Sequence, residues 1–467
     1  MVSFESGGER RIFPPLFHTS RTRLPGAENF QSDRNRKMAK HTDSPSSPSA
    51  DAIRSAMEEI GERARIASRI LANTETKIKD EWLLSMADAL ENSSAELLRE
   101  NARDMKVGRD AGLSGAMLDR LQLTPERIKA MADGLRHVTS LEDPVGRRLS
   151  TILRPNGLRI EKVSVPIGVI GFIYESRPNV TADAAGLCLK AGNAVILRGG
   201  SEAFHSNMAI AQCISHAAVA HGMPEGAVQL IPWTDRAAVA AMLKMDRFID
   251  LIIPRGGEGL IRYVVENSTI PVIKHYKGIC HIFVDADCNM EMALDIIENA
   301  KCQRPGVCNA LETLLIHEDI AESFVPKFAA RMRACGVELR GANRFCELVK
   351  DALPASEEDW STEYLDLILS VRIVPDLRSA VEHINHYGSG HSDCIVTENP
   401  ANAEYFLNHV DSAAVYVNAS TRFTDGGEFG MGAEIGISTD KLHARGPMGL
   451  PELTSYKYKI YGSGQIR

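Results

Sequence analysis

The chain has 467 residues and a formal net charge of −8, so it is too long for one compact core and should divide into two or three domains. Its composition, 44% hydrophobic and 24% charged, is typical of a globular protein. No basic stripe indicates a nucleic-acid partner, and no apolar run reaches the roughly 18 residues that a membrane span needs, which argues against a membrane partner.

The first fifty residues, 1–50, are rich in Ser, Pro, Gly and Arg and show no helical or strand periodicity. Such a segment cannot bury enough apolar surface to offset its ordering entropy, which predicts a disordered extension. Met38 is a plausible alternative start. The Arg and Ser content would also suit a transit peptide, but acidic residues such as Glu5 and Glu28 count against one.

Residues 51–145 have helical patterns, followed by two strand-like runs at 150–165. Ser93 and Glu96 have the spacing of a capping box, and Thr124-Pro125-Glu126 should open a further helix. Asn156-Gly157 joins the two runs and predicts a β-hairpin. The C-terminal "LTSYKYKIYGSG" should be a strand that pairs with this hairpin, either within one chain or across a dimer.

Strands and helices then alternate twice, over 163–275 and over 281–418, which predicts an α/β protein with two doubly wound parallel-sheet lobes. The strand candidates are "VSVPIGVIGFI", "AVILRG", "AVQLIP", "FIDLIIP", "PVIKH", "HIFVDAD", "LETLLIH", "LILSVRIV", "DCIVTEN" and "AAVYVNAS". A substrate cleft is expected where the lobes meet. Glycines follow several strand ends, notably Gly199 and Gly200 and then Gly256 and Gly257, but no G-x-G-x-x-G fingerprint occurs.

Two cysteines six positions apart, Cys302 and Cys308, lie in "NAKCQRPGVCNALE". The chain has nine cysteines, an odd number without a secretory signal, which predicts free thiols in a reducing cytoplasm. No Cys-x-x-Cys occurs, so a zinc site is not expected. Cys302 should be buried in a helix, whereas Cys308 follows Arg304-Pro305-Gly306 on a loop. Lys301 and Arg304 could favour its thiolate, and burial as a small apolar residue is the alternative.

Three stretches carry a resemblance to a known family: "VPIGVIGFIYESRPNVTADAAGLCLKAGNAVILRGGSEA", "NAKCQRPGVCNALETLLIH" and "VNASTRFTDGGEFGMGAEIGISTDKLHARGPMGLPELTSYKY". Together they resemble the γ-glutamyl phosphate reductases, which belong to the aldehyde dehydrogenase superfamily. The resemblance covers about residues 51–467 and implies an aldehyde dehydrogenase-like fold. It implies a cofactor-binding domain at 51–149 and 164–279, a catalytic domain at 280–423, an oligomerisation arm at 150–163 and 447–467, and a return segment at 424–446.

The resemblance also implies an enzyme, a glutamate-5-semialdehyde dehydrogenase of the phosphorylating, NADP-dependent kind. In such an enzyme the Cys308 thiolate attacks L-glutamyl 5-phosphate and expels phosphate, leaving a thioester that NADPH reduces to L-glutamate 5-semialdehyde. This reaction is the second step of proline biosynthesis from glutamate. An oxyanion forms twice, and its expected donors are the Cys308 backbone N–H and Asn179, which is a few positions out of register with the family's asparagine.

Hydrolytic aldehyde dehydrogenases carry a glutamate that activates water, in a Glu-Leu-Gly-Gly motif. The matching stretch here has Lys274 and His275 at that place, and no glutamate occurs from Asn267 to Met290. An acyl-phosphate reductase does not need this glutamate, because an activated water would hydrolyse the thioester before it is reduced. The departure therefore argues against ordinary aldehyde oxidation.

By the same resemblance, the residues expected to bind NADPH or NADP are Arg198, Gly199, Ser201, Glu202, Gly256, Gly257 and Glu363. The residues expected to bind the substrate's phosphate and carboxylate are Arg177, Arg304, Arg422 and Arg445, since arginine forks suit both groups. Each arginine could instead be an ordinary surface or salt-bridge residue, and Glu363 a strand-end carboxylate.

The expected partners are the small-molecule substrate, a transient contact with the glutamate 5-kinase that would supply the acyl phosphate, and further copies of the chain in a dimer or tetramer. No metal is expected. Two other classes of function stay open: a hydrolytic or CoA-dependent aldehyde dehydrogenase, and a non-catalytic α/β protein that binds a ligand in its cleft.

Overall fold

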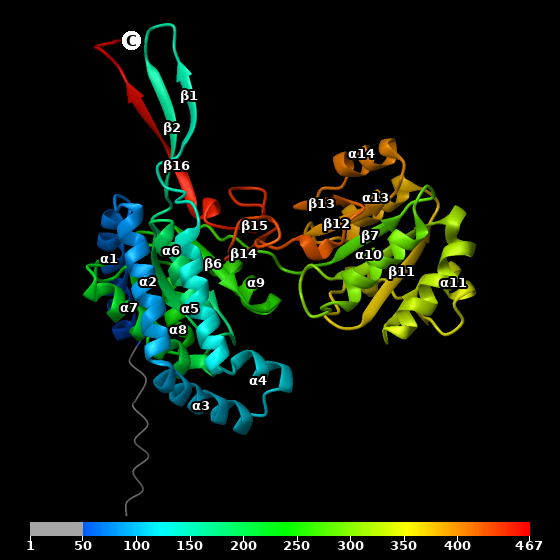
Figure 1. Ribbon diagram of the computed structural model, residues 1–467, viewed down its shortest axis with the longest axis horizontal. Coiled ribbons are helices and arrows are strands. Elements are labelled where there is room, and N and C mark those ends of the chain that lie inside the picture. The colour runs from blue at the N-terminus through cyan, green and yellow to red at the C-terminus, as the bar shows by residue number, and fades with distance from the viewer. Residues whose placement is uncertain (1–49) are drawn as a thin grey trace, which may run out of the picture. The chain divides into compact units, whose positions relative to one another are not determined.

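The computed structural model describes residues 50–467 (Figure 1). The predicted N-terminal extension lies outside the described residues, except for Ala50, which begins the first helix. The predicted α/β class with parallel sheets is confirmed, in a four-stranded and a seven-stranded sheet. Among residues 50–467, no helix combines the length and the apolar character that crossing a membrane would require.

The first lobe begins with helices and continues with alternating strands and helices. The helices are α1 Ala50–Leu71, α2 Thr76–Asn92, α3 Ser94–Asp110, α4 Gly115–Leu121, α5 Pro125–Ser140, α6 Val180–Lys190, α7 Phe204–Ala220, α8 Arg236–Met242 and α9 Glu258–Asn267, with the 3₁₀ turn η1 Ser201–Ala203. The strands are β3 Val169–Tyr174, β4 Ala194–Arg198, β5 Val228–Leu230 and β6 Leu251–Arg255, in the parallel order β5-β4-β3-β6. Helices α1 and α8 contact each other, α1 and α6 pack on the sheet, and α2 packs over α5 and α7.

Local signals in this lobe are partly confirmed. Thr124 caps α5 as expected, accepting a hydrogen bond from the backbone N–H of Arg127 at 3.2 Å. The predicted capping box at Ser93 is wrong, because α3 begins directly after α2 and the Ser93 side chain makes no cap hydrogen bond. Its hydroxyl instead accepts from the Cys213 thiol. The predicted strand "PVIKH" forms only a single bridge, at Val272.

The second lobe is built on seven parallel strands in the order β10-β9-β11-β8-β7-β12-β13. The strands are β7 Cys280–Val284, β8 Leu311–His317, β9 Glu338–Gly341, β10 Leu353–Pro354, β11 Ile368–Val374, β12 Ser392–Val396 and β13 Ala414–Val417. The helices are α10 Met290–Cys302, α11 Glu318–Ala334, α12 Asn343–Leu348, α13 Leu377–Tyr387 and α14 Pro400–His409, with 3₁₀ turns η2 Glu358–Ser361 and η3 Thr421–Phe423.

Alternate residues of the central strands face two different cores. Ile282 and Leu314 join the core that contains α10, α11 and α12, whereas Phe283 and Leu315 join the core that contains α13 and α14. A sheet that is buried on both faces explains why its strands are almost continuously apolar in the sequence.

An antiparallel sheet of β1 Arg148–Leu153, β2 Arg159–Pro166 and β16 Thr454–Tyr461 forms a separate arm, seen as the cyan and red ribbon of Figure 1. The expected hairpin is present, and Gly157 has the positive φ of 85° that its turn requires. The C-terminal strand pairs with β2 within the same chain, along its whole length. A small sheet of β14 Gly436–Ser438 and β15 Gly446–Met448, with the turn η4 Pro451–Leu453, precedes this strand.

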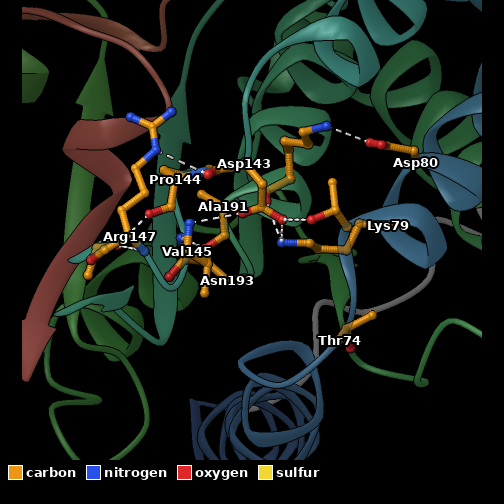
Figure 2. A network of polar contacts seen from close by, with 12 residues as sticks. Thr74, Lys79, Asp80, Asp143, Pro144, Val145, Arg147, Ala191 and Asn193 are labelled. Atoms are coloured by element: carbon orange, nitrogen blue, oxygen red, sulfur yellow. Dashed lines mark hydrogen bonds and ion pairs between the residues drawn. The ribbon is translucent and has the colours of Figure 1, made fainter. Parts of the chain in front are cut away.

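Two buried lysines hold the base of this arm to the first lobe (Figure 2). Lys79 of α2 pairs with Asp143 at 2.5 Å and donates to the carbonyl oxygen of Lys190 at 2.9 Å. Lys190, at the end of α6, in turn pairs with Asp80 at 2.6 Å. Each buried ammonium group is therefore both ion-paired and hydrogen-bonded, which offsets the cost of removing it from water. The network fixes the segment before β1 against α2 and α6.

Candidate active site

Cys308 lies on the loop of residues 303–310, between α10 and β8, as predicted. Gly278 lies against this loop, because a Cβ atom at that position would collide with the carbonyl oxygen of Cys308. The buried Cys280 thiol donates to the same oxygen, with sulfur and oxygen 3.3 Å apart. The segment that enters β7 therefore fixes the backbone of Cys308 from one side.

An ion pair joins the two ends of this loop. Lys301 Nζ and Glu312 Oε2 are 2.7 Å apart, and both side chains are fully buried. Burial lowers the pKa of Lys301 and raises that of Glu312 to about 7, while the partner's charge opposes each shift. Glu312 also accepts a hydrogen bond from the backbone N–H of Leu365. The expectation that Lys301 favours the Cys308 thiolate is thereby corrected, because its charge is matched by Glu312.

The electrostatic surroundings of Cys308 come from residues distant in the sequence. Burial raises the pKa of Cys308 to about 11, Arg255 opposes this rise, and the carboxylates of Glu363 and Glu434 add to it. Arg255 ends β6, and Glu434 lies in the segment after η3. Neither was predicted as a site residue. A charged residue directly after the buried strand "FIDLIIP" was the one available signal for Arg255.

Three of the predicted substrate arginines gather with Arg255 around the Cys308 loop. Burial lowers the pKa of Arg177, and the charges of Arg120, Arg255 and Arg304 lower it further. Burial also lowers the pKa of Arg422, Arg304 adds to this effect, and Cys308 opposes it. None of the four guanidinium groups has an ion-pair partner in the part of the chain that the structure describes. Unbalanced positive charge of this kind suits the binding of an anion.

Two predicted site residues are engaged elsewhere. Arg445 donates to Asp411 Oδ1 at 2.8 Å and to the Asp411 carbonyl oxygen at 3.1 Å, so it is ion-paired with a carboxylate that it shares with Lys441. The Asn179 amide donates to Asp183 Oδ2 at 2.8 Å, at the start of α6. Within residues 50–467, no hydrogen bond joins Asn179 to the Cys308 loop. These contacts oppose the roles predicted for Arg445 and Asn179.

Arg422 of η3 holds both ends of the loop. Its Nε donates to Gln303 Oε1 at 3.0 Å, and its Nη1 donates to Asn309 Oδ1. Thr421 Oγ1 donates to the Asn309 carbonyl oxygen at 2.7 Å, and the Asn309 amide donates back to Thr424 O at 2.9 Å. The Cys308 loop is therefore fixed by η3 on one side and by the segment before β7 on the other.

Glu363 reaches the same place, since its Oε1 accepts a hydrogen bond from the backbone N–H of Gly278 at 2.9 Å. Burial raises the pKa of Glu363. Lys274 and His275, at the place of the hydrolytic glutamate, are held by other partners. Lys274 pairs with Asp440, and His275 Nδ1 lies 2.9 Å from Ile437 O. Burial and the charge of Arg255 lower the pKa of His275 to about 4.

The predicted cofactor residues other than Glu363 lie at or directly after the carboxyl ends of β4 and β6. Glu202 Oε1 accepts hydrogen bonds from the backbone N–H and the hydroxyl of Ser176, at 2.6 and 2.8 Å. Gly199 lies against Asn207, leaving no space for a Cβ atom. The N–H of Gly257, at the start of α9, already donates to Glu175 at 2.9 Å, so an anion there would have to displace that carboxylate.

A cavity of about 480 Å³ opens beside these residues, lined in part by Ser176, Ser201 and Glu202. Arg198 donates from Nη2 to Thr234 O, but its Nε is buried without a hydrogen-bond partner. A buried donor without a partner is uncommon and is readily satisfied by a ligand oxygen. The geometry here therefore fits the nucleotide end of a dinucleotide cofactor.

Comparison with known proteins agrees with this arrangement. The family model for the aldehyde dehydrogenase family matches residues 30–345. The chain is 60% identical over 407 residues to the gamma-glutamyl phosphate reductase of Moorella thermoacetica, covering 87% of this chain and 97% of that relative. The chain belongs to the aldehyde dehydrogenase family, among the gamma-glutamyl phosphate reductases. The predicted family is thereby confirmed.

Other relatives support the same assignment. The gamma-glutamyl phosphate reductase of Caldanaerobacter subterraneus is 60% identical over 409 residues, covering 87% of this chain and 98% of the relative. The crystal structure of the Thermotoga maritima gamma-glutamyl phosphate reductase has a TM-score of 0.87 at 47% identity, covering 88% of this chain and 99% of that one. A glyceraldehyde-3-phosphate dehydrogenase of Methanocaldococcus jannaschii complexed with NADP shares the fold, with a TM-score of 0.63 at 14% identity over 88% of this chain and 95% of that one.

The place of Arg255 leads to a prediction about the reactivity of Cys308. Replacing Arg255 with Gln should slow alkylation of Cys308 by iodoacetamide several-fold at pH 8, because losing the cation raises the pKa of the thiol and lowers the thiolate fraction. In the unaltered protein the rate should keep rising with pH toward about 11. Mass spectrometry of the Cys308 peptide gives the rate.

Arg445→Gln is the matched control, because this variant removes an arginine that is ion-paired with Asp411 and is not among the groups that shift the pKa of Cys308. An Arg255→Gln variant that is alkylated as fast as the control would show that Arg255 does not act on the sulfur.

Proposed function

We propose that the protein reduces L-glutamyl 5-phosphate to L-glutamate 5-semialdehyde with release of phosphate, through a thioester on Cys308. The observation that carries the proposal is the group of four arginines without ion-pair partners around the Cys308 loop. Such a site suits a substrate with a phosphate and a carboxylate, and the names of the relatives agree with it.

In the first step the Cys308 sulfur forms a bond to the acyl carbon while the carbon–oxygen bond to phosphate breaks. The thiol proton leaves with the phosphate, which balances the charge of a thiol that burial keeps protonated near neutral pH. Arg177, Arg255 and Arg304 stabilise the negative charge that grows on the departing phosphate. The backbone N–H of Cys308 makes no hydrogen bond to another residue within 50–467, so it is available to the oxyanion.

Bound NADPH would supply the hydride that reduces the thioester. The Ser201 and Glu202 region would hold the cofactor's nucleotide end, and Arg198, whose buried Nε has no hydrogen-bond partner within residues 50–467, precedes it at the end of β4. Glu363 keeps one carboxylate oxygen beyond its bond to Gly278, which suits a ribose hydroxyl. When the thiohemiacetal collapses, the aldehyde leaves and the sulfur takes up a proton, which restores the Cys308 thiol.

The absence of a glutamate at Lys274 and His275 fits this reaction. The Lys274 ammonium is paired with Asp440, and His275 is neutral at physiological pH. Neither is a carboxylate that could activate water against the thioester. The two carboxylates that act on Cys308, Glu363 and Glu434, are each bound to a backbone N–H, of Gly278 and Gly426 respectively.

The arm supports a second part of the proposal, that copies of the chain associate through it in a dimer or tetramer. Ile152, Ile160 and Ile460 stand in one cross-strand row, and Ile152 and Ile460 are 48% and 60% exposed. An apolar row on a protruding sheet is stabilised by burial against another copy. The contact with glutamate 5-kinase and the cytoplasmic location stay predictions.

The double variant Ile152→Glu with Ile460→Glu should lower the molar mass measured by light scattering toward that of one chain, because the two charges oppose burial of the row. Glu382→Gln, on the exposed face of α13, is the control and should leave the mass unchanged. An unchanged mass in the double variant would refute association through this face.

Replacing Cys308 with Ala should abolish phosphate-dependent oxidation of glutamate 5-semialdehyde by NADP⁺, by several orders of magnitude, because the nucleophile is lost. NADPH binding, followed by fluorescence titration, should persist, since the Arg198 region is unchanged.

Cys302→Ala is the matched variant. Cys302 ends α10, and burial together with its hydrogen bond to Cys335 raises the pKa of its thiol to about 12. The Cys302→Ala variant should therefore retain most activity. If the Cys308 variant kept substantial turnover, or if a folded Cys302 variant were inactive instead, the thioester on Cys308 would be wrong.

A further inference from the structure

A second cavity lies beside Arg422, on the second lobe. Its volume is about 230 Å³, and it is lined by Asn299, Gln303, Arg422, Phe423, Asp425 and Glu428. One wall is the end of α10 and the start of the Cys308 loop, and the other is η3 with the residues that follow it. The cavity thus shares both of its walls with the elements that hold Cys308.

The cavity presents charges of both signs. Arg422 uses Nε and Nη1 for Gln303 and Asn309, and no carboxylate pairs with it among the described residues, so positive charge and further N–H donors remain. Asp425 Oδ1 accepts from the N–H groups of Gly427 and Glu428, at 2.8 and 3.4 Å, while no hydrogen bond within residues 50–467 engages its Oδ2.

Glu428 is exposed, and its carboxylate has no ion-pair or hydrogen-bond partner in the described part of the chain. The positive charge of Arg422 beside the carboxylates of Asp425 and Glu428 complements the charges of a zwitterion, which carries one negative and one positive group. An α-amino acid carries that pair of charges on a single carbon atom, as a carboxylate and an ammonium group.

The position of Arg422 also suits the substrate proposed above. Three carbon–carbon bonds separate the acyl carbon of a glutamyl group from its α-carbon, a span of about 4 Å when extended. Arg422 is joined to the Cys308 loop, since its Nη1 donates to the side chain of Asn309, the residue directly after Cys308. A glutamyl group attacked at Cys308 could therefore extend its α-carbon toward Arg422.

We propose that this cavity binds the α-amino-acid head group, with Arg422 on the carboxylate and Asp425 and Glu428 on the ammonium group. The inference rests on the proposed function and adds a basis for choosing an amino acid over a simple dicarboxylic acid derivative. It also assigns different roles to the arginines, since Arg422 binds the carboxylate while Arg177, Arg255 and Arg304 bind the phosphate.

The test compares two aldehydes in the phosphate-dependent oxidation with NADP⁺: glutamate 5-semialdehyde, and 5-oxopentanoate, which keeps the carboxylate and lacks the amino group. The double variant Asp425→Asn with Glu428→Gln should raise the KM for glutamate 5-semialdehyde on the order of ten- to a hundredfold, the loss expected for a charge-assisted hydrogen bond. The ratio of kcat/KM between the two aldehydes should fall by the same factor.

The substitutions are chosen to keep the local structure. Asn at 425 retains the Oδ1 acceptor that binds the backbone of Gly427 and Glu428. Alkylation of Cys308 by iodoacetamide should match that of the unaltered protein, which shows that the loop is intact. Glu382 is an exposed acid of α13 in the same lobe, and Glu382→Gln should leave the KM and kcat for both aldehydes unchanged.

The outcomes separate the two proposals. An unchanged KM for glutamate 5-semialdehyde would overturn the head-group site. An equal loss of kcat/KM with both aldehydes would overturn it too, because the two carboxylates would then not bind the amino group. If the unaltered protein oxidised neither aldehyde in a phosphate-dependent way, the proposed function itself would fail.

Discussion

The buried ion pair between Lys301 and Glu312 is the contact on which the site depends, because it joins the two ends of the loop that carries Cys308. Both side chains are fully buried, so removing one partner would leave an uncompensated charge in the core, at a cost of about 3–5 kcal/mol. Through Leu365 the same pair also reaches the segment of Glu363. This ion pair therefore acts with the contacts of η3 and of Gly278 to fix the loop, and it connects the loop to the segment of a carboxylate proposed for the cofactor.

The unpaired arginines gather around this loop. Arg304 lies on it and Arg422 is hydrogen-bonded to it, whereas Arg177 and Arg255 belong to the first lobe, and none of the four has a carboxylate that neutralises it within residues 50–467. The mutual repulsion of the guanidinium groups lowers the stability of the free protein. An anion that binds between them relieves this repulsion, and the energy released would add to the affinity for the proposed substrate. Burial keeps the thiol of Cys308 protonated until that substrate arrives, since it raises the pKa to about 11.

The turns, the Thr124 cap and the pairing of the C-terminal strand with the hairpin could be predicted from the sequence, whereas the start of α3 at Ser93 and the long-range pairing of side chains could not. The hairpin at Asn156-Gly157 and the cap at Thr124 depend on a few adjacent residues, and both are present. Lys301 lies seven positions from Cys308, yet it pairs with Glu312. The two side chains pair because both are buried together, which the sequence spacing does not show. Arg255 belongs to the other lobe and its charge acts on the pKa of Cys308, so no spacing in the sequence could reveal it.

The most direct test of the account is the product of glutamate 5-semialdehyde oxidation by NADP⁺, followed at increasing concentrations of inorganic phosphate. A thioester shielded from water and released by phosphate predicts a saturable phosphate requirement, with one acyl phosphate formed per NADPH. The same turnover without phosphate, with glutamate as the product, would contradict it.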